Sequence, residues 1–266
     1  MNAALPFGFS VDQDGVALLT LDRQPTLNSL TFEVYAALER LFLGLQTDAS
    51  VKALVLTGAG RGFCSGGSVD EIIAPLLQRD LAETLRFTRM TGAVVRNMRR
   101  LDQPIVAAVN GVAAGAGAVL ALASDLRVLS DRASFAFLFS RVGLTGADMG
   151  AAWLLPKVIG AGRAAELLLL GDKIDAQECW RIGLANRVVP HDQMLGEAMA
   201  LAKRLATGPR LAHGMTKRML TNESGMDLDS AIEQEAQAQA LLLRAQDHRE
   251  FYEAWQARRP PRFEGR

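Results

Sequence analysis

The sequence predicts an α/β protein whose strands pair in parallel, followed by a region made of helices alone. Three observations lead to this fold class. Strand-like apolar runs alternate with amphipathic helical stretches, which is typical of parallel crossover units. The 266 residues are 49% hydrophobic but only 6% aromatic, which favours an interior of tightly packed layers of small and aliphatic side chains. From about residue 192 onward, no strand-like run occurs.

The first hundred residues are predicted to hold two strands and two helices. Residues 15–23 and 51–60 are rich in aliphatic and β-branched side chains, and the second run ends in glycines. Between them, Thr31 starts an amphipathic run that continues to about residue 46. A long helix is expected from about Asp80 to Leu101. This order of strand, helix, strand and helix is that of a crossover unit.

The next ninety residues continue the alternation. Strands are predicted at 103–111 and 124–130, with a small-residue helix over 113–123 between them. A short strand and a loop are expected over 132–144. No fixed sequence period is visible, which disfavours a solenoid of identical repeats.

The change of character near residue 192 divides the chain into two predicted parts. Residues 1–191 are expected to form the α/β core, which binds the ligand, and residues 192–266 a helical region. The last helix combines an apolar stripe with many alanines and glutamines, a composition that suits packing against another helix or subunit.

Charge and composition exclude several classes of protein. The 29 basic residues balance the 29 acidic ones, which disfavours a nucleic-acid-binding protein. Cys64 and Cys179 lie far apart and have no metal-ligand spacing, so we expect free thiols in a reducing compartment. The N-terminus lacks the pattern of a secretory signal, and no apolar run reaches the ~20 residues of a membrane span. These features predict a cytoplasmic protein without a membrane partner.

Two glycine-rich loops are candidates for ligand binding. "FCSGGSV" (63–69) and "NGVAAGAGAVLA" (110–121) each follow an apolar strand and precede helical residues. Free amides at a helix start can form an oxyanion hole, worth roughly 3 kcal/mol per donor in a transition state. Neither loop is a P-loop or a GxGxxG fingerprint. The alternative is that small residues only let helices pack close to the sheet, and composition does not decide between the two.

A single acid, Asp148, lies in the apolar and glycine-rich run 141–160. It stands where a loop is expected to turn into a helix. Aspartate is a favoured N-cap there, contributing roughly 1 kcal/mol. The other interpretation is that Asp148 is the acid–base group of an enzyme.

Taken in order, these stretches resemble one known family over nearly the whole chain. "ALVLTGAGRGFCSGGSVDEI", "QPIVAAVNGVAAGAGAVLALASDLRVLSDRASFAF" and "VGLTGADMGAAWLLPKVIG", with "GLANRVVPHDQM" and the closing "RRPPRF", are similar to the enoyl-CoA hydratase/isomerase (crotonase) superfamily. The resemblance implies a crotonase-like spiral of ββα units with a C-terminal α-helical trimerisation region. It also implies an acyl-CoA thioester as substrate, a homotrimer or dimer of trimers, and no metal or other cofactor, because CoA arrives with the substrate.

The resemblance also assigns residues to the site. The amides of Gly67 and Ala116 would form the oxyanion hole; the family usually has glycine at the second position, but alanine keeps the N–H. Arg61 would lie near the CoA phosphates, and Phe263 near the adenine of its own or a neighbouring subunit. The full set implied to bind substrate or CoA is Asn28, Leu30, Arg61, Gly66, Ser68, Gly115, Phe139 and Phe263.

The sequence departs from the hydratases of this superfamily at two positions. Their two glutamates, which activate water, are replaced by Val119 and Phe139. With a one-residue offset, "GLTGADMG" resembles the "GLxPDxGG" stretch of the isomerases, so Asp148 matches their proton-carrying aspartate. We therefore expect double-bond isomerisation by one carboxylate. Burial among Phe135, Phe137, Phe139 and Trp153 would raise the pKa of that carboxylate.

Other functions remain open at this point. A hydratase could use Asp148 together with Asp70 or Glu71, and a chain without the glutamates could bind acyl-CoA without catalysis. Dehalogenase chemistry is disfavoured, because Gly92 stands where those relatives carry a histidine. A nucleophilic role of Cys64 is also disfavoured, since no histidine lies close in the sequence, and a packed small hydrophobe fits better.

Overall fold

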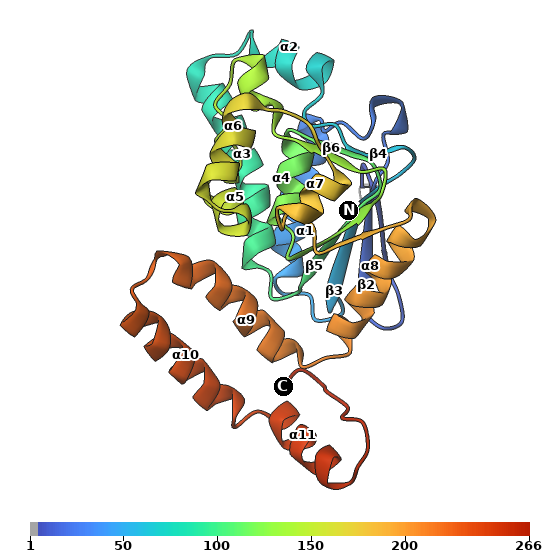
Figure 1. Cartoon of the computed structure of the whole chain (residues 1–266), viewed down its shortest axis with the longest axis vertical. Coiled ribbons are helices and arrows are strands. Elements are labelled where there is room, and N and C mark those ends of the chain that lie inside the picture. The colour runs from blue at the N-terminus through green and yellow to red at the C-terminus, as the bar shows by residue number, and fades with distance from the viewer. Residues whose placement is uncertain (1–4) are drawn as a thin grey trace.

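The computed structural model describes residues 5–266 and contains two sheets with helices around them (Figure 1). The larger sheet has six strands in the order β1-β2-β3-β5-β7-β10, and the smaller has four in the order β4-β6-β8-β9. The strands of the larger sheet are β1 (Gly8–Val11), β2 (Val16–Leu21), β3 (Ala53–Gly58), β5 (Ile105–Val109), β7 (Leu126–Ser130) and β10 (Arg187–Val189). Those of the smaller are β4 (Gly62–Cys64), β6 (Val112–Ala114), β8 (Ser134–Ala136) and β9 (Ile174–Asp175).

Successive turns of the chain contribute one strand to each sheet. The pairs β3 and β4, β5 and β6, and β7 and β8 follow one another along the chain, and each sheet pairs them in parallel. Among the strands of residues 5–266, only β1 with β2 and β8 with β9 pair antiparallel. The predicted parallel crossover arrangement is therefore confirmed. Strand β4 was expected as a loop, and Ala113 and Ala114 of β6 were wrongly expected to start the small-residue helix, which begins at Ala116. Three-residue runs that include glycine or alanine carry no alternation.

The predicted helix starts are confirmed by their caps. The Thr31 hydroxyl accepts from the amide of Val34 at the start of α1, and Asp80 forms a reciprocal capping box with Glu83 at the start of α3. The helices are α1 (Phe32–Leu45), α2 (Ala74–Leu76), α3 (Leu81–Arg100), α4 (Ala116–Ala123), α5 (Ala151–Ile159), α6 (Ala161–Leu170), α7 (Ala176–Arg181), α8 (His191–Ala206), α9 (Arg210–Asn222), α10 (Leu228–Leu242) and α11 (Gln246–Gln256).

The central strands β3 and β5 of the larger sheet are buried on both faces. Along β3, Leu54 and Leu56 pack with residues of α1, α3 and α4, whereas Val55 packs with residues of α8. Helix α8 thus covers one face of the sheet, although it lies almost wholly in the region expected to be purely helical. Helices α9, α10 and α11 extend away from the core (Figure 1). No helix in residues 5–266 is long and apolar enough to cross a membrane.

Candidate active site

The first glycine loop forms a parallel β-bridge with the chain at Leu30. The amide of Leu30 donates to the carbonyl of Gly66 at 2.8 Å, and the amide of Ser68 donates to the carbonyl of Leu30 at 2.9 Å. Gly66 has a φ of +100°, which favours glycine. The Ser68 hydroxyl caps the π-helical turn that follows, by accepting from the amide of Glu71. Within the described residues, the amide of Gly67 donates to no backbone carbonyl.

The second glycine loop supplies another free amide next to the first. The amide of Gly115 donates to the carbonyl of Ala136 at 2.8 Å, and Gly115 has a φ of +50°. Ala116 then begins α4, where an N–H has no acceptor within the helix. A Cβ built on Gly66 would lie 3.6 Å from the amide nitrogen of Ala116, so the two loops are in contact. The structure therefore brings together the two loops that carry Gly67 and Ala116.

Close packing accounts for other glycines of the same loops. A Cβ on Gly117 would lie 2.2 Å from the carbonyl oxygen of Cys64, and one on Gly111 would lie 2.0 Å from that of Arg61. For these two residues, the packing interpretation of the small side chains is right. The Cys64 side chain is fully buried, and burial raises the pKa of its thiol to about 12. Cys64 is thus a packed small residue, as expected.

The helix-cap interpretation of Asp148 is wrong. The N-cap of α5 is Gly150, two residues later. Oδ1 of Asp148 instead accepts from the amide of its neighbour Met149 at 2.8 Å. Met149 has a φ of +50°, an unfavourable conformation for this side chain. The Asp148 side chain therefore bonds its neighbour in the chain and does not cap α5. Backbone strain such as that at Met149 is often found at functional sites.

Asp148 has a raised pKa and lies near a second titratable residue, Tyr35. The half-buried carboxyl has a raised pKa because of desolvation, partly offset by the hydrogen bond from Met149. The pKa of Tyr35, on α1, is raised well above its usual value by burial and then by the nearby Cys64 and Asp148. Sequence analysis missed Tyr35. Its position on the apolar stripe of the predicted helix was the available signal, because a buried tyrosine hydroxyl usually has a polar partner.

The positions of the two missing glutamates are apolar in the structure as well. Val119 is fully buried in α4, and Phe139 is half-buried in a 3₁₀ turn. Phe135 and Phe137 are core residues. Trp153, in contrast, is 47% exposed, and the ammonium of Lys157 lies 2.7 Å from its ring centroid. Trp153 is therefore not a buried wall around Asp148 in the single chain, and packing of the other three rings against Asp148 stays a prediction.

The carboxylates of the alternative hydratase interpretation lie at the surface. Asp70 and Glu71 are both exposed, in the turn after the first glycine loop. Glu71 forms an ion pair with Arg23. Neither residue is placed as a buried partner of Asp148.

The residues expected to bind CoA are only partly brought together. Asn28 is buried, and its side chain holds its loop by donating to the carbonyl of Gly62 at 2.7 Å. Arg61 is exposed on the turn between β3 and β4. Phe263 borders a cavity of about 330 Å³ among α9, α10 and α11, so within this chain it does not join the others. A contact between Phe263 and CoA stays a prediction that involves a neighbouring subunit.

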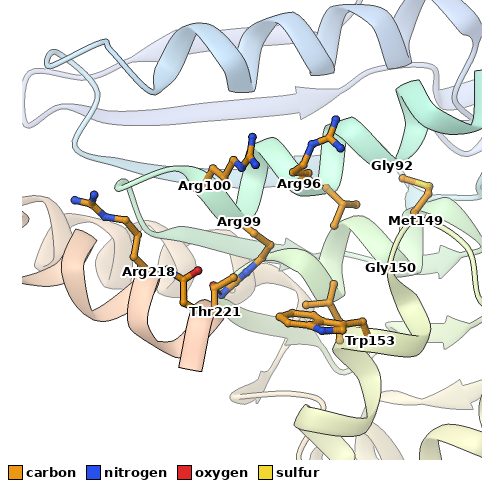
Figure 2. A pocket seen from close by; sticks show the side chains of 12 residues that line it. Gly92, Arg96, Arg99, Arg100, Met149, Gly150, Trp153, Arg218 and Thr221 are labelled. Carbon is orange, nitrogen blue, oxygen red and sulfur yellow. Dashed lines mark hydrogen bonds between the residues drawn. The ribbon is translucent and has the colours of Figure 1, made fainter. Parts of the chain in front are cut away.

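A cavity of about 510 Å³ lies between α3, α5 and α9 (Figure 2). Met149 and Gly150, the two residues after Asp148, form part of its wall. Apolar side chains and arginines make up most of the remainder. The lining consists of Gly92, Val95, Arg96, Arg99, Arg100, Met149, Gly150, Trp153, Leu154, Arg218, Thr221 and Asn222.

Comparisons with known proteins identify the family of this chain. Residues 12–266 match the family model for enoyl-CoA hydratase/isomerase. The chain is 37% identical to 1,2-epoxyphenylacetyl-CoA isomerase of Escherichia coli (strain K12), over 98% of this chain and 100% of that protein. It is 41% identical to the probable enoyl-CoA hydratase echA12 of Mycobacterium bovis, over 85% and 79% of the two chains.

Solved structures show the same architecture. The crystal structure of a presumed enoyl-CoA hydratase from Streptomyces coelicolor A3(2) superposes with a TM-score of 0.96 at 52% identity, covering 98% of this chain and 94% of that one. The enoyl-CoA hydratase of Bacillus anthracis gives 0.91 at 28% identity, covering 98% and 99%. The expected crotonase-like α/β fold is confirmed. The chain therefore belongs to the enoyl-CoA hydratase/isomerase family of enzymes.

Proposed function

We propose that the protein moves the double bond of an enoyl-CoA thioester, with Asp148 as the proton carrier. One observation carries this proposal: Asp148 is a half-buried carboxyl of raised pKa that lies near Tyr35, as does Cys64 of the first glycine loop, while Val119 and Phe139 occupy the positions of the hydratase glutamates. Addition of water requires both a base for the water and an acid for the α-carbon, whereas proton transfer between two carbons requires one group.

The reaction follows from these groups. Asp148 removes a proton from C2 of a 3-enoyl thioester, and the electron pair moves into a dienolate with its charge on the thioester oxygen. The amides of Gly67 and Ala116 donate to that oxygen, and such donors act most strongly where charge develops. Asp148 then returns the proton to C4, which leaves the 2-enoyl product. A raised pKa makes the carboxylate a stronger base for the first step.

The same proposal assigns residues that would contact the CoA moiety. It would follow the loop of Asn28 and Leu30 toward the exposed Arg61, whose charge suits the phosphates. In a homotrimer, Phe263 of a neighbouring subunit would reach the adenine. Gly66, Ser68, Gly115 and Phe139 would border the thioester and the acyl group.

The names of relatives favour a second candidate function. The E. coli relative is named an isomerase of an acyl-CoA, but several others, including the M. bovis protein, are named hydratases. Hydration by this chain would require Asp148 to act with Asp70 or Glu71. The exposure of both residues and the ion pair of Glu71 with Arg23 support the isomerase instead.

Proton exchange in heavy water separates these functions. A 3-enoyl-CoA and a 2-enoyl-CoA are incubated with the native protein, Asp148→Asn, Asp70→Asn and Glu71→Gln. We expect deuterium uptake with double-bond migration in the native protein, a loss of about 100-fold or more in Asp148→Asn, and little change in the other two variants. Equal exchange in native protein and Asp148→Asn contradicts the proposal. Formation of 3-hydroxyacyl-CoA that depends on Asp70 or Glu71 supports the hydratase.

A further inference from the structure

The cavity between α3, α5 and α9 carries positive charge that the proposed reaction does not use (Figure 2). We propose that it is a second binding site, separate from the site of Asp148, and that it binds a phosphate monoester with an apolar or aromatic body. Asp148, Gly67 and Ala116 do not line this cavity, so the inference does not depend on the roles proposed for them.

The charged residues of the lining are all basic. Four of the twelve lining residues are arginines, and none is an aspartate or a glutamate. Arg218 pairs with Asp102 at 3.0 Å. Arg99 pairs with Asp125 at 2.7 Å, but this carboxylate also pairs with Lys217 at 2.8 Å. The two acids lie outside the lining and neutralise at most two of the four arginines.

Arg96 and Arg100 are the two arginines that remain. Both are exposed, and within the part of the chain that the structure describes neither takes part in an ion pair. They lie four residues apart on α3, a spacing at which like charges repel each other. Figure 2 shows their side chains extending to the same side of this helix. An anion bound between the two guanidinium groups would relieve this repulsion.

A third arginine has a donor without an acceptor. Nε of Arg99 is buried and has no hydrogen-bond partner among residues 5–266, although Nη1 donates to Asp125 and Nη2 donates to Thr221 at 2.9 Å. A buried donor without an acceptor costs free energy, and a bound water or ion often supplies that acceptor. Because Arg99 lines the cavity, the cavity is where such an acceptor can lie.

A phosphate monoester suits these donors better than a carboxylate does. It carries a charge of about −2 at neutral pH and has three acceptor oxygens, whereas a carboxylate carries a single charge on two oxygens. Arginine binds phosphate through two parallel hydrogen bonds. The charge of one phosphate group therefore matches the two unpaired arginines.

The rest of the lining favours an organic body on the phosphate. The apolar side chains of the cavity are Val95, Met149, Trp153 and Leu154. Figure 2 shows the Trp153 ring across the cavity from the two unpaired arginines. The volume of about 510 Å³ lies within the roughly 300–1,000 Å³ typical of small-molecule sites. A ligand with its phosphate on the arginines can thus place an apolar body against Trp153.

Calorimetry at constant ionic strength tests the inference, with phenyl phosphate, inorganic phosphate and benzoate as probes. Phenyl phosphate should bind at least tenfold more tightly than either of the others, which lack the aromatic body or the second charge. Arg96→Gln/Arg100→Gln should weaken its binding by tenfold or more. Arg86→Gln/Arg89→Gln, exposed on the same helix but outside the lining, is the matched control and should bind as the native protein does. Trp153→Ala should reduce the advantage of phenyl phosphate over inorganic phosphate.

Several outcomes overturn the inference. Among them are no binding of phenyl phosphate at millimolar concentration, equal affinities for the three probes, and equal losses in the two double-arginine variants, which would show only a general attraction to the surface. Displacement of phenyl phosphate by hexanoyl-CoA would assign the arginines to the CoA site. Dissociation of the Arg96/Arg100 variant in sedimentation would assign them to a contact with a second copy of the chain. Unchanged binding in Asp148→Asn supports a separate site, whether or not that variant loses isomerase activity.

Discussion

The α/β core and the helices α9 to α11 bury their apolar residues to very different extents. All residues of β3, β5 and α4 are buried. Helix α10, with 15 residues, buries only Ala238 and leaves Leu228, Ile232 and Leu241 more than half exposed. These two strands and α4 are therefore covered within the chain, whereas α10 has an apolar face that the single chain does not cover.

This difference separates two sources of stability. The strands and α4 are stabilised by burial within the chain, and their contribution should not depend on protein concentration. An exposed apolar helix gains stability only when another surface covers it. The expected homotrimer would provide such a surface, and it stays a prediction. The following substitutions test the two regions and the joint between them.

The largest effect is expected at the joint between α9 and the core. Asp125 accepts from Lys217 of α9 at 2.8 Å and from Arg99 of α3 at 2.7 Å, and Lys217 is only 5% exposed. Asp125→Ala leaves the buried ammonium of Lys217 without a charged partner, with only the carbonyl of Gln103 as acceptor, and should lower the free energy of unfolding by about 3–5 kcal/mol. Urea denaturation measures this change.

An exposed ion pair in the same joint is the control. Asp102 pairs with Arg218 of α9 at 3.0 Å, and both side chains are about half exposed. Asp102→Ala should cost less than about 1 kcal/mol. Similar losses in the two variants would show that burial of the Asp125 pair contributes little.

A matched pair of leucines compares the two regions directly. Leu54 in β3 is fully buried, so Leu54→Ala should cost about 2–5 kcal/mol at any protein concentration. Leu241 in α10 is 64% exposed, and Leu241→Ala should change the stability of the single chain by less than about 0.5 kcal/mol. Thermal unfolding over a range of concentrations makes the comparison. A large loss for Leu241→Ala that grows with concentration would show that an assembly covers α10.

Two helical glycines test the packing of the second glycine loop. A Cβ on Gly117 in α4 would lie 2.2 Å from the carbonyl oxygen of Cys64, whereas one on Gly196 in α8 meets no atom within 4 Å. Gly117→Ala should cost about 1–3 kcal/mol and reduce isomerase activity, because α4 must move away from the first loop. Gly196→Ala should stabilise by up to about 1 kcal/mol and leave activity unchanged. Denaturation and exchange assays measure both effects.

The smallest expected effect is the response of Asp148 to pH. Its pKa is higher in the folded than in the unfolded chain, so its contribution to stability is complete below the unfolded value and declines as the pH rises through the folded value. Asp148→Asn has no such dependence. Its stability relative to the native protein should therefore increase with pH from about 4 upward and then level off. A pH-independent difference between the two proteins would mean that Asp148 ionises normally.

The long strands and helices of the core, the two glycine loops and the single acid of the run 141–160 could be predicted from the sequence. Alternation, amphipathic periodicity and caps such as Thr31 and Asp80 are local, so the residues that produce them are close in the chain. The short strands β4 and β6 lack such a local signal and were missed.

Contacts between residues far apart in the chain depend on the tertiary structure. The parallel sheets bring the loop of Gly67 against that of Ala116, and the fold places Tyr35 near Asp148. Asp148 does not cap α5, because that helix begins at Ala151 and its N-cap is Gly150. The arginines of the cavity come from α3 and α9, more than a hundred residues apart. Contacts of this kind depend on the order of strands and on helix packing, which are set by the burial of the whole core rather than by any local pattern.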